Sequence, residues 1–353
     1  MKLDVIQRRN FTAAWRIILA GLAISFVYPV FKHGFTNPVH FINAFFIGFL
    51  GGVFVSYCEL ELFKNLKRLR SFIPRVIFKT MLYFFGFAIF IPLIILVCES
   101  IFYRRGLKEH FNSREFQEFI FEKDFGIILL YALFFLILVI FTREISIKLG
   151  QGVLWNYITG KYHRPRTEER LFMFIDIRNS TKIAEQLSEL EYHLFVNEFI
   201  NDLTPVILNF QGIIYRYVGD QIGITWDGMN GFHKANCIRV FLNAQNTIHR
   251  KREKYLDRFG FIPRFVACLH SGPVVIGELG DVKSQIVYVG ETIHTLGQIE
   301  SQFKKIKDGT LILISDHALK QTRIPALFAL ENLGSLKGFS GKMDVYTLEE
   351  KAV

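Results

Sequence analysis

Hydrophobic residues are unevenly distributed along this chain and divide it into two parts. Roughly the first 145 residues contain four long apolar stretches without charge, and the remainder mixes apolar and polar positions. The four stretches are Ile17–Phe31, Phe41–Cys58, Met81–Cys98 and Gly126–Phe141. Each approaches the ~20 apolar residues that cross a bilayer as a helix, although the two shortest would also suit buried helices of a soluble protein. Four in series predict an N-terminal four-helix transmembrane bundle.

In the second part, short apolar runs alternate with segments of helical spacing. The expected elements are a strand at 171–177, a helix at 181–210, two strands within 213–226, a helix at 230–259, a strand pair within 264–280 that turns at Ser271–Pro273, a helix at 290–306, and strands at 309–315 and 344–350. The order strand, helix, strand, strand, helix, strand predicts an α+β ferredoxin-like (βαββαβ) domain with additions.

The segment between these two parts has apolar residues at helical spacing over 145–158, followed by Gly160 and Pro165, which end the pattern. This predicts a helix that leaves the membrane. It would either transmit motion into the next domain or serve only as a linker, and the sequence favours neither. The predicted domains are a transmembrane anchor at 1–143, a transducer helix or linker at 144–168, and a cytoplasmic domain at 169–353.

The positive charges predict an orientation. The chain carries a formal net charge of +10. Its basic residues gather in the N-terminal tail and between the second and third stretches, at Lys2, Arg8, Arg9, Arg16, Lys64, Lys67, Arg68, Arg70, Arg75 and Lys79. By the positive-inside rule, both termini of a multi-pass protein of the inner or plasma membrane face the cytoplasm, where these residues meet anionic lipid. No basic patch accompanies a nucleic-acid-reading motif, so nucleic-acid binding is not expected.

The cysteines and one histidine could be mistaken for ligands of a metal. Cys58, Cys98, Cys237 and Cys268 have no paired spacing. They are therefore expected to be reduced, buried thiols. His270 stands at the end of a predicted strand without a second ligand at metal spacing, so a structural role is expected.

Two carboxylates are the candidates for metal chemistry. Asp176 lies near the end of the strand "FIDI", and Asp220 lies in the hairpin turn of "YVGDQIGITW". In a split βαββαβ sheet the first strand lies beside the hairpin, so both side chains can meet at one edge. With the backbone carbonyl of Ile177 they would offer the oxygen ligands that Mg²⁺ prefers. The alternative reading of Asp220 is turn chemistry alone.

Three motifs, "FMFIDIRNSTKIAE", "YVGDQIGITW" and "LHSGPVVIGELG", resemble the class III nucleotide cyclases, including membrane-anchored bacterial adenylate cyclases. The resemblance covers Gly160 to about Leu348. It implies a head-to-tail dimer that binds ATP at its interface, with Asp176 and Asp220 holding two Mg²⁺ or Mn²⁺ ions. It also implies that the ribose 3′-hydroxyl attacks the α-phosphate, so that cyclic AMP and pyrophosphate form.

The resemblance weakens at the two positions where the family's side chains orient the ribose and stabilise the transition state. The family pattern G-D-x-V-N-x-x-x-R reads "GETIHTLGQ" here, with His294 at the Asn position and Gln298 at the Arg position. Neutral Gln cannot make the charged, forked contact of Arg with phosphate. Losing one such donor costs ~10²–10³ in rate, so strongly reduced turnover is expected. At the base-reading positions stand Arg216 and Val287, which leave ATP or GTP open.

These observations predict a membrane-anchored adenylate cyclase of cyclic-nucleotide signalling. The alternative is a catalytically impaired pseudo-cyclase that binds metal and nucleotide. In a further variant, the chain forms a heterodimer with a cyclase subunit that supplies the missing Asn and Arg.

Overall fold

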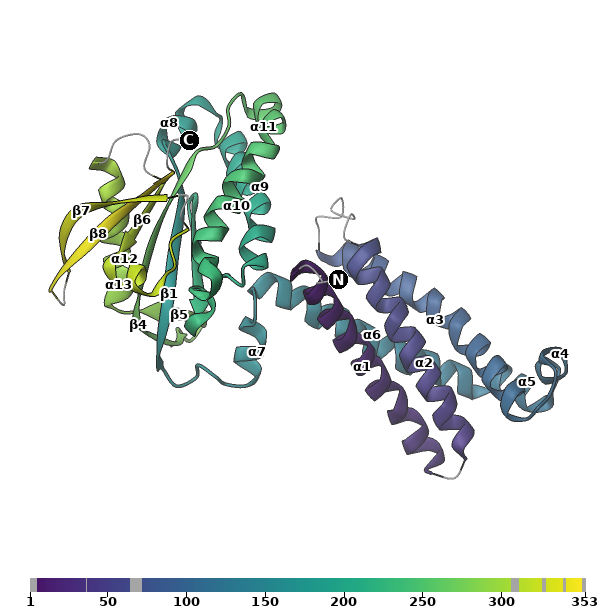
Figure 1. Ribbon diagram of the computed structural model, residues 1–353. Helices are drawn as coiled ribbons and strands as arrows, with labels where there is room; N and C mark the ends of the chain where they lie inside the picture. Colours follow the sequence, from purple (N-terminus) through teal and green to yellow (C-terminus); the bar gives the residue numbers. More distant parts are fainter. Residues whose placement is uncertain are drawn as a thin grey trace. The chain divides into compact units, whose positions relative to one another are not determined.

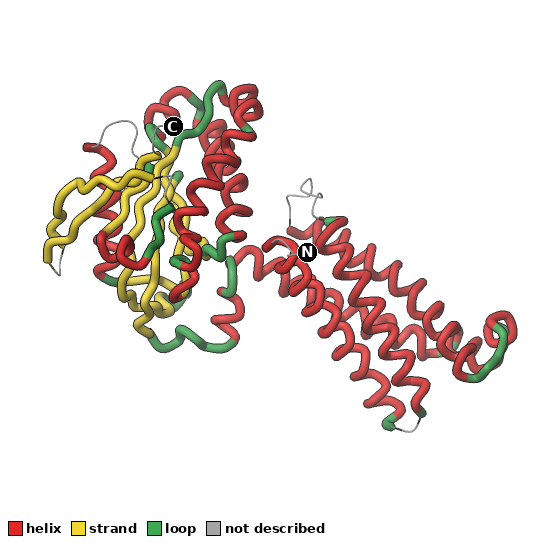
Figure 2. Tube along the Cα trace, viewed as in Figure 1, coloured by secondary structure: helices red, strands yellow, loops and turns green. Residues whose placement is uncertain are grey.

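The computed structural model describes residues 5–35, 37–63, 72–305, 311–325, 328–338 and 341–350. Its contacts divide the chain into two compact units, Met1–Lys148 and Leu149–Val353. The first unit is built of helices and the second of a mixed sheet with helices (Figures 1 and 2). The predicted division at residues 143 and 168 stays a prediction.

The first unit contains the four predicted apolar helices. Its elements are α1 (Val5–His33), α2 (Pro38–Tyr57), the π-helix η1 (Cys58–Leu62), α3 (Phe72–Phe102), the short α4 (Leu107–Phe111) and α5 (Arg114–Phe121), and α6 (Lys123–Leu149). The apolar portions of α1, of α2 with η1, of α3 and of α6 are long enough to cross a membrane. Each contains one of the predicted stretches and extends it at both ends.

Glycines allow α1 and α2 to approach closely. A Cβ atom added at Gly48 would lie 2.3 Å from Oγ of Ser25, and one at Gly52 would lie 2.7 Å from Cα of Ile18. Small residues at this four-residue spacing bring helix backbones together in apolar surroundings.

A buried ion-pair network joins η1, α3 and α6. Nζ of Lys79 lies 3.1 Å from Oε2 of Glu59 and 2.9 Å from Oε1 of Glu144. Arg143 pairs with Glu59 at 2.9 Å, and Arg75 pairs with Glu144 at 3.1 Å. The prediction that Arg75 and Lys79 belong to a lipid-facing basic loop is therefore wrong, because both lie within α3 and find carboxylates inside the unit. Lys2, Lys64, Lys67, Arg68 and Arg70 lie outside the described residues.

The second unit contains a sheet with helices on both faces. Its elements are α7 (Val153–Ile158), β1 (Arg166–Ile177), α8 (Ser180–Gln186), α9 (Glu189–Asn209), β2 (Ile213–Val218), β3 (Gln221–Asp227), the 3₁₀ turns η2 (Gly228–Asn230) and η3 (His233–Ala235), α10 (Asn236–Arg250), α11 (Arg252–Phe259), β4 (Phe265–Leu279), β5 (Gln285–Val289), α12 (Glu291–Ser301), η4 (Gln302–Lys305), β6 (Ile312–Ser315), α13 (Asp316–Gln321), β7 (Phe328–Gly338) and β8 (Gly341–Glu350). The sheet order is β2-β3-β1-β4-β6-β8-β7, and β5 pairs with β4. The predicted βαββαβ order is confirmed, with β5 to β8 as additions.

The predicted strand pair turning at Ser271–Pro273 is wrong. β4 is one strand of 15 residues, whose first part pairs with β1 and whose last part pairs with β5. The chain reverses only after Gly280, whose φ of +93° is a left-handed conformation that suits glycine. Pro273 does not interrupt β4 because it lies between the segment that pairs with β6 and the segment that pairs with β5. Among the described residues no strand pairs with it on that edge, so its missing amide proton leaves no hydrogen bond unmade there.

Three predicted helices are interrupted in the structure. The helix predicted over 145–158 is the end of α6 followed by α7, because Gly150 and Gly152 adopt φ values of +100° and +71° between them. The helix at 181–210 divides into α8 and α9, since Ser188 and Glu191 form a capping box. The helix at 230–259 begins as 3₁₀ turns and divides into α10 and α11 at Lys251.

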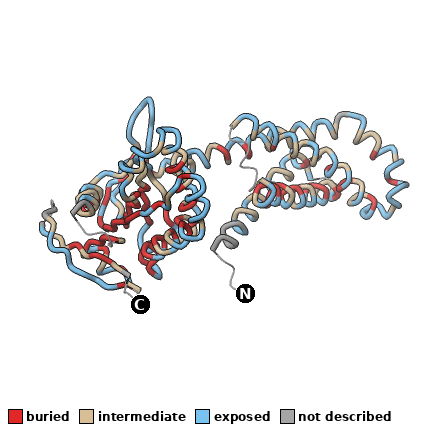
Figure 3. Tube along the Cα trace, turned by 90° about the horizontal axis from the view of Figure 1, so that it is seen from above, coloured by how far each residue is buried: buried red, intermediate tan, exposed pale blue. Residues whose placement is uncertain are grey.

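Two hydrophobic cores lie on the two faces of the sheet. One includes Phe199 of α9, Phe241 of α10 and Trp226 of β3, and the other includes Phe172 of β1 and Leu296 of α12. Figure 3 shows the buried residues concentrated in the interior of this unit. Burial of both faces explains why β1 is a continuous apolar run rather than an alternating one.

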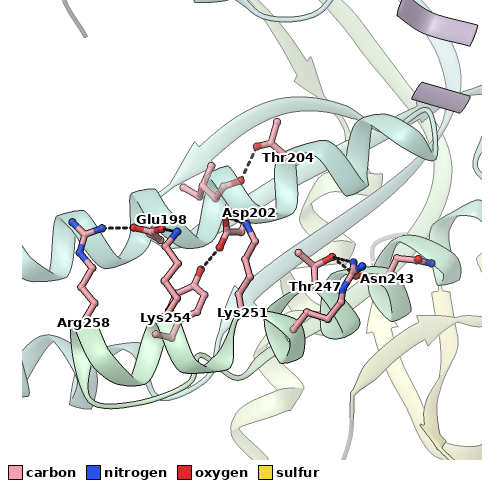
Figure 4. Close-up of polar contacts among 11 residues, drawn as sticks. Glu198, Asp202, Thr204, Asn243, Thr247, Lys251, Lys254 and Arg258 are labelled. Atoms are coloured by element: carbon pink, nitrogen blue, oxygen red, sulfur yellow. Dashed lines mark hydrogen bonds and ion pairs between the residues drawn. The ribbon is translucent and has the colours of Figure 1, made fainter. Parts of the chain in front are cut away.

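Polar contacts fasten α9 to the α10–α11 segment (Figure 4). Asp202 of α9 is buried, and its Oδ1 lies 2.5 Å from Nζ of Lys251. The hydroxyl of Tyr255, which is fully buried, donates to Oδ2 of Asp202 at 3.1 Å. Nearer solvent, Lys254 and Arg258 both pair with Glu198.

We expect Asp202→Ala to lower the free energy of unfolding by about 2–3 kcal/mol, because it leaves a buried hydroxyl without its acceptor. Glu198→Ala should cost less than about 1 kcal/mol, since its partners are half exposed and surface ion pairs contribute little. Denaturant unfolding of the full chain in detergent, followed by circular dichroism, measures both. Equal losses in the two variants would contradict the assignment of Asp202 as the main polar contact.

Candidate active site

The β2–β3 hairpin carries Asp220 to the end of β1. Val218 pairs with Gln221, which leaves Gly219 and Asp220 as a two-residue turn, and Gly219 has φ +61°. This is the turn that the sequence predicts. β1 runs antiparallel to β3 with Ile175 opposite Ile222. Continuing this register places the hairpin turn beside the last residues of β1, where Asp176 stands.

The electrostatics of Asp176 reflect the nearby Asp220. Burial raises the pKa of Asp176 well above its usual range, and the charge of Asp220 and a hydrogen bond between the two carboxyl groups act in the same direction. Glu300 contributes a smaller effect of the same sign. Two carboxylates within hydrogen-bonding reach of each other repel unless a proton or a cation lies between them. The structure therefore brings the two predicted acidic residues together.

The carboxylate pair fits a divalent cation. Oδ2 of Asp220 is buried and has no hydrogen-bond partner among the described residues. An acceptor left without a donor in this position is suited to a metal ligand, and Mg²⁺ and Mn²⁺ both accept carboxylate oxygens. Across the described ranges, no three His, Cys, Asp or Glu side chains form a cluster suited to a metal. A cation here would therefore complete its coordination with backbone carbonyls such as that of Ile177, with water and with substrate.

Two further residues near this pair were not predicted. Glu300 of α12 accepts a hydrogen bond from Nε2 of Gln221, which directly follows Asp220 in the chain. Tyr192 of α9 is half-buried, and its pKa is raised by burial and then by the charge of Asp220. Tyr192 would be taken from sequence for a core position of an amphipathic helix. The only sequence signal for Glu300 is its position two residues after Gln298, on the same helix.

His294 and Gln298 lie on a different side of α12. Residues four apart share a helix face, so these two point in similar directions. At 100° per residue, Gln298 and Glu300 are separated by about 200° around the helix axis. Since Glu300 faces Gln221 of its own chain, Gln298 points away from the carboxylate pair. His294 is exposed and Gln298 half-buried, so one chain does not bring them to Asp176 and Asp220.

The guanidinium of Arg216, in the first strand of the hairpin, lies over two aromatic rings. It lies 4.8 Å from the ring centroid of Phe174 and 5.4 Å from that of Tyr215. The pairing with β3 shifts register between Ile214 and Arg216, which marks a bulge. Gly223 faces this bulge, and a Cβ there would lie 2.8 Å from Cγ of Arg216. Nε of Arg216 is buried without a partner among the described residues, so one donor is available to a ligand.

Val287, the second base-reading position, lies on β5 opposite Gly277 of β4. β5 is not a sheet neighbour of β2, yet the rings of Tyr215 and Tyr288 approach with centroids 4.9 Å apart. The strands that carry Arg216 and Val287 therefore approach each other through the neighbouring residues Tyr215 and Tyr288. The half-buried Val287 side chain offers no hydrogen bond there.

His270 is a buried histidine of β4, 6% exposed, and its Nδ1 lies 2.8 Å from Oγ of Ser315. Burial, followed by the nearby His317, lowers its pKa from 6.5 to about 4. The opposing charges of Asp316 and Glu291 do not restore it.

We expect His270 to make the protein less stable as the pH falls from 6.5 towards 4. In that range the unfolded chain binds a proton that the folded chain excludes. The contribution of His270 to the free energy of unfolding is therefore fully present above pH 6.5, and it falls by up to about 3 kcal/mol as the pH drops to 4. Comparing unfolding free energies of wild type and His270→Gln at pH 7 and pH 4.5 measures this contribution. The exposed His193 provides the control: an equal effect of His193→Gln would contradict the prediction.

Curated relatives of the chain are adenylate cyclases. Adenylate cyclase 2 of Rhizobium meliloti (strain 1021) is 32% identical over 223 residues, which cover 63% of this chain and 61% of that protein. The adenylate cyclase of Anabaena cylindrica is 24% identical over 187 residues, which cover 52% of this chain and 37% of that protein. The chain thus spans less than two thirds of the length of either relative. No protein-family model matches it.

Solved structures show the same fold. Two structures of a bacterial light-regulated adenylyl cyclase match the chain with TM-scores of 0.50 and 0.53. Their identities are 18% and 16%, covering 60% and 66% of this chain and 62% and 68% of those chains. At such identities the likeness concerns the fold alone.

Proposed function

We propose that the chain is a class III nucleotide cyclase that converts ATP to cyclic AMP and pyrophosphate. The observation that carries this proposal is the carboxylate pair of Asp176 and Asp220, whose mutual repulsion and unpaired buried oxygen suit a divalent cation. Mg²⁺ or Mn²⁺, two ions per site, would be held by these side chains and the carbonyl of Ile177. When bound, such ions neutralise charge on the reacting phosphates.

The remaining roles fall to side chains that point away from the carboxylate pair of their own chain. We propose a head-to-tail dimer in which His294 and Gln298 of one chain complete the site that Asp176 and Asp220 of the other begin. His294 would hydrogen-bond the ribose, and Gln298 would contact the phosphates as a neutral donor. Arg216 would offer its unpaired Nε to the base, while Val287 would contact it through apolar surface. A heterodimer with another cyclase subunit would use the same surfaces.

The placement in a membrane is also part of the proposal. The four apolar helices of the first unit would anchor the protein in the inner or plasma membrane, with both termini in the cytoplasm. The cyclase domain would then have access to cytoplasmic ATP. Cyclic-nucleotide signalling is the process that such a domain serves.

Turnover by the full chain in lipid nanodiscs tests this function. We expect ATP with Mn²⁺ or Mg²⁺ to give cyclic AMP, at a rate well below that expected of a site with the family's Arg, because Gln298 carries no charge. Chromatographic detection of cyclic AMP and cyclic GMP from parallel ATP and GTP reactions measures both activity and base preference. Failure to form either product under any metal condition would overturn the proposal.

His294 and Gln298 favour a second candidate function, that of a pseudo-cyclase. Such a protein would bind nucleotide only in the presence of the metal and would release no cyclic product. Equilibrium binding of ATP with and without Mn²⁺, measured beside the turnover assay, distinguishes it from an active enzyme.

A further inference from the structure

The helices of the first unit surround a large cavity. Its volume is about 1250 Å³, and residues of α1, α2, α3 and α6 line it together with the short helices α4 and α5. Small residues of α2, including Gly48 and Gly51, and apolar side chains such as Ile91 and Phe135 are among the residues that line it. Cavities of this size and lining accommodate small organic molecules.

Polar groups gather at the end of the cavity where α3 ends and α6 begins. Glu99 of α3 is their centre: Nδ2 of Asn43 donates to its Oε1 at 2.8 Å, and Nε2 of His110 lies 3.2 Å from its Oε2. Asn43 is 6% exposed and His110 is fully buried, and all three residues line the cavity. Three separate helices, α2, α3 and α4, therefore supply this cluster.

The atoms of this cluster that still lack a hydrogen-bond partner in the described part of the chain are acceptors. Oδ1 of Asn43 and Nδ1 of His110 are buried without a partner among the described residues. The Asn43 amide must present its NH₂ group to Glu99, because a carboxylate only accepts hydrogen bonds. The amide oxygen is therefore left without a donor. For the same reason a neutral His110 carries its proton on Nε2, so that Nδ1 has a lone pair. A ligand that completes the cluster must donate hydrogen bonds.

The charge at this end is also negative. The cavity is lined by five acidic side chains, Glu99, Glu115, Glu118, Glu122 and Asp124, against the basic side chains of Arg16, Arg105 and His40. Three of them have basic partners, since Glu115 pairs with Arg105, Glu118 with Arg114 and Asp124 with Lys32. Glu99 pairs with no Lys or Arg among the described residues, and a neutral His110 donates a hydrogen bond to it without bringing a positive charge. A half-buried carboxylate of this kind is complemented by a cation.

We propose that this cavity binds an amphipathic organic amine. Its ammonium group donates to Glu99, to Oδ1 of Asn43 and to Nδ1 of His110, and its apolar part lies along the glycine-rich wall of α2. A lipid tail or an uncharged apolar molecule would leave the two buried acceptors unpaired, at a cost of roughly 1–3 kcal/mol each. The inference goes beyond the proposed cyclase activity, since it concerns a ligand of the first unit.

Thermal unfolding of the full chain in nanodiscs of zwitterionic lipid tests this site. Decylammonium, decanol and decanoate serve as probes of equal chain length that differ in the head group. We expect decylammonium to raise the unfolding temperature saturably, decanol to do so at least tenfold more weakly, and decanoate not at all. Glu99→Gln should weaken the decylammonium response at least tenfold, and Asn43→Ala, on a different helix, should weaken it as well.

Glu109→Gln is the matched control, because Glu109 is an exposed acid on α4 that does not line the cavity. It removes the same charge near the cavity and should leave the response unchanged. Equal responses to decylammonium and decanol, or an unchanged response in both cavity variants, would overturn the proposal and leave a cavity filled by lipid tails. If Glu99→Gln does not fold, Asn43→Ala decides. Because the readout is binding, it is independent of cyclase turnover.

Discussion

Asp220→Asn should reduce cyclic-nucleotide formation about 10³-fold or more without reducing the stability of the fold. Charge neutralisation at a reacting phosphate contributes several kcal/mol, and each 1.4 kcal/mol changes a rate tenfold. The variant also removes the like charge that helps to raise the pKa of Asp176. Its unfolding temperature without metal should therefore equal or exceed that of wild type, which separates loss of chemistry from loss of structure.

The measurements are turnover with Mn²⁺, and the rise in unfolding temperature on adding Mn²⁺, for wild type and variant. Asp227→Asn is the matched control, since Asp227 ends β3, the strand that follows Asp220. Its side chain is 61% exposed and lies 3.7 Å from Arg170 rather than beside Asp176. It should retain both turnover and the Mn²⁺ response. An Asp220→Asn protein with wild-type turnover would exclude the carboxylate pair from the chemistry.

Gln298→Arg should increase turnover about 10²–10³-fold. The substitution supplies a charged, forked donor to the phosphates, and a single donor of this kind contributes that much in comparable sites. Gln298 is half-buried on α12 and, on the helix geometry given above, is directed away from the carboxylate pair of its own chain. His294→Asn alone should change turnover less, because it exchanges one hydrogen-bonding group for another.

Gln298→Lys separates charge from geometry, since Lys brings the charge without the planar fork. We expect its gain to be smaller than that of Gln298→Arg. Turnover that stays at the wild-type level in both variants, and in Gln298→Arg combined with His294→Asn, would contradict a homodimeric site. A partner subunit that carries its own Asn and Arg would then be the remaining arrangement of this kind.

The carboxylate pair could be predicted from the sequence because local patterns determine it. The apolar run that ends at Asp176 and the turn at Gly219–Asp220 each have a clear signature, and the βαββαβ order places them together. The length of β4 could not be predicted, because Gly272 and Pro273 are typical of turns. In the structure, Gly272 instead allows close approach of Thr292, whose hydroxyl donates to the carbonyl of Pro273 at 2.7 Å.

Contacts between distant segments account for what the sequence did not predict. Glu300 reaches the site through Gln221, 79 residues earlier. Glu99 lies just beyond the predicted apolar stretch Met81–Cys98, and its partners Asn43 and His110 come from two other helices. No spacing rule along one segment connects these residues, so the polar end of the cavity emerges only in three dimensions.

The pairing of β1 with β4 has a consequence for biosynthesis. Residues 166–177 of β1 pair with residues 265–276, about a hundred positions later in the chain. At ~5–20 residues per second, a ribosome needs roughly 5–20 s to complete that partner after β1 has left the exit tunnel. During this interval β3 can protect one edge of β1, but the other edge of "LFMFIDI" stays open to pairing with other nascent chains. Under the proposed membrane anchoring, the four apolar helices made earlier would hold each chain in its own place and keep such open strands apart.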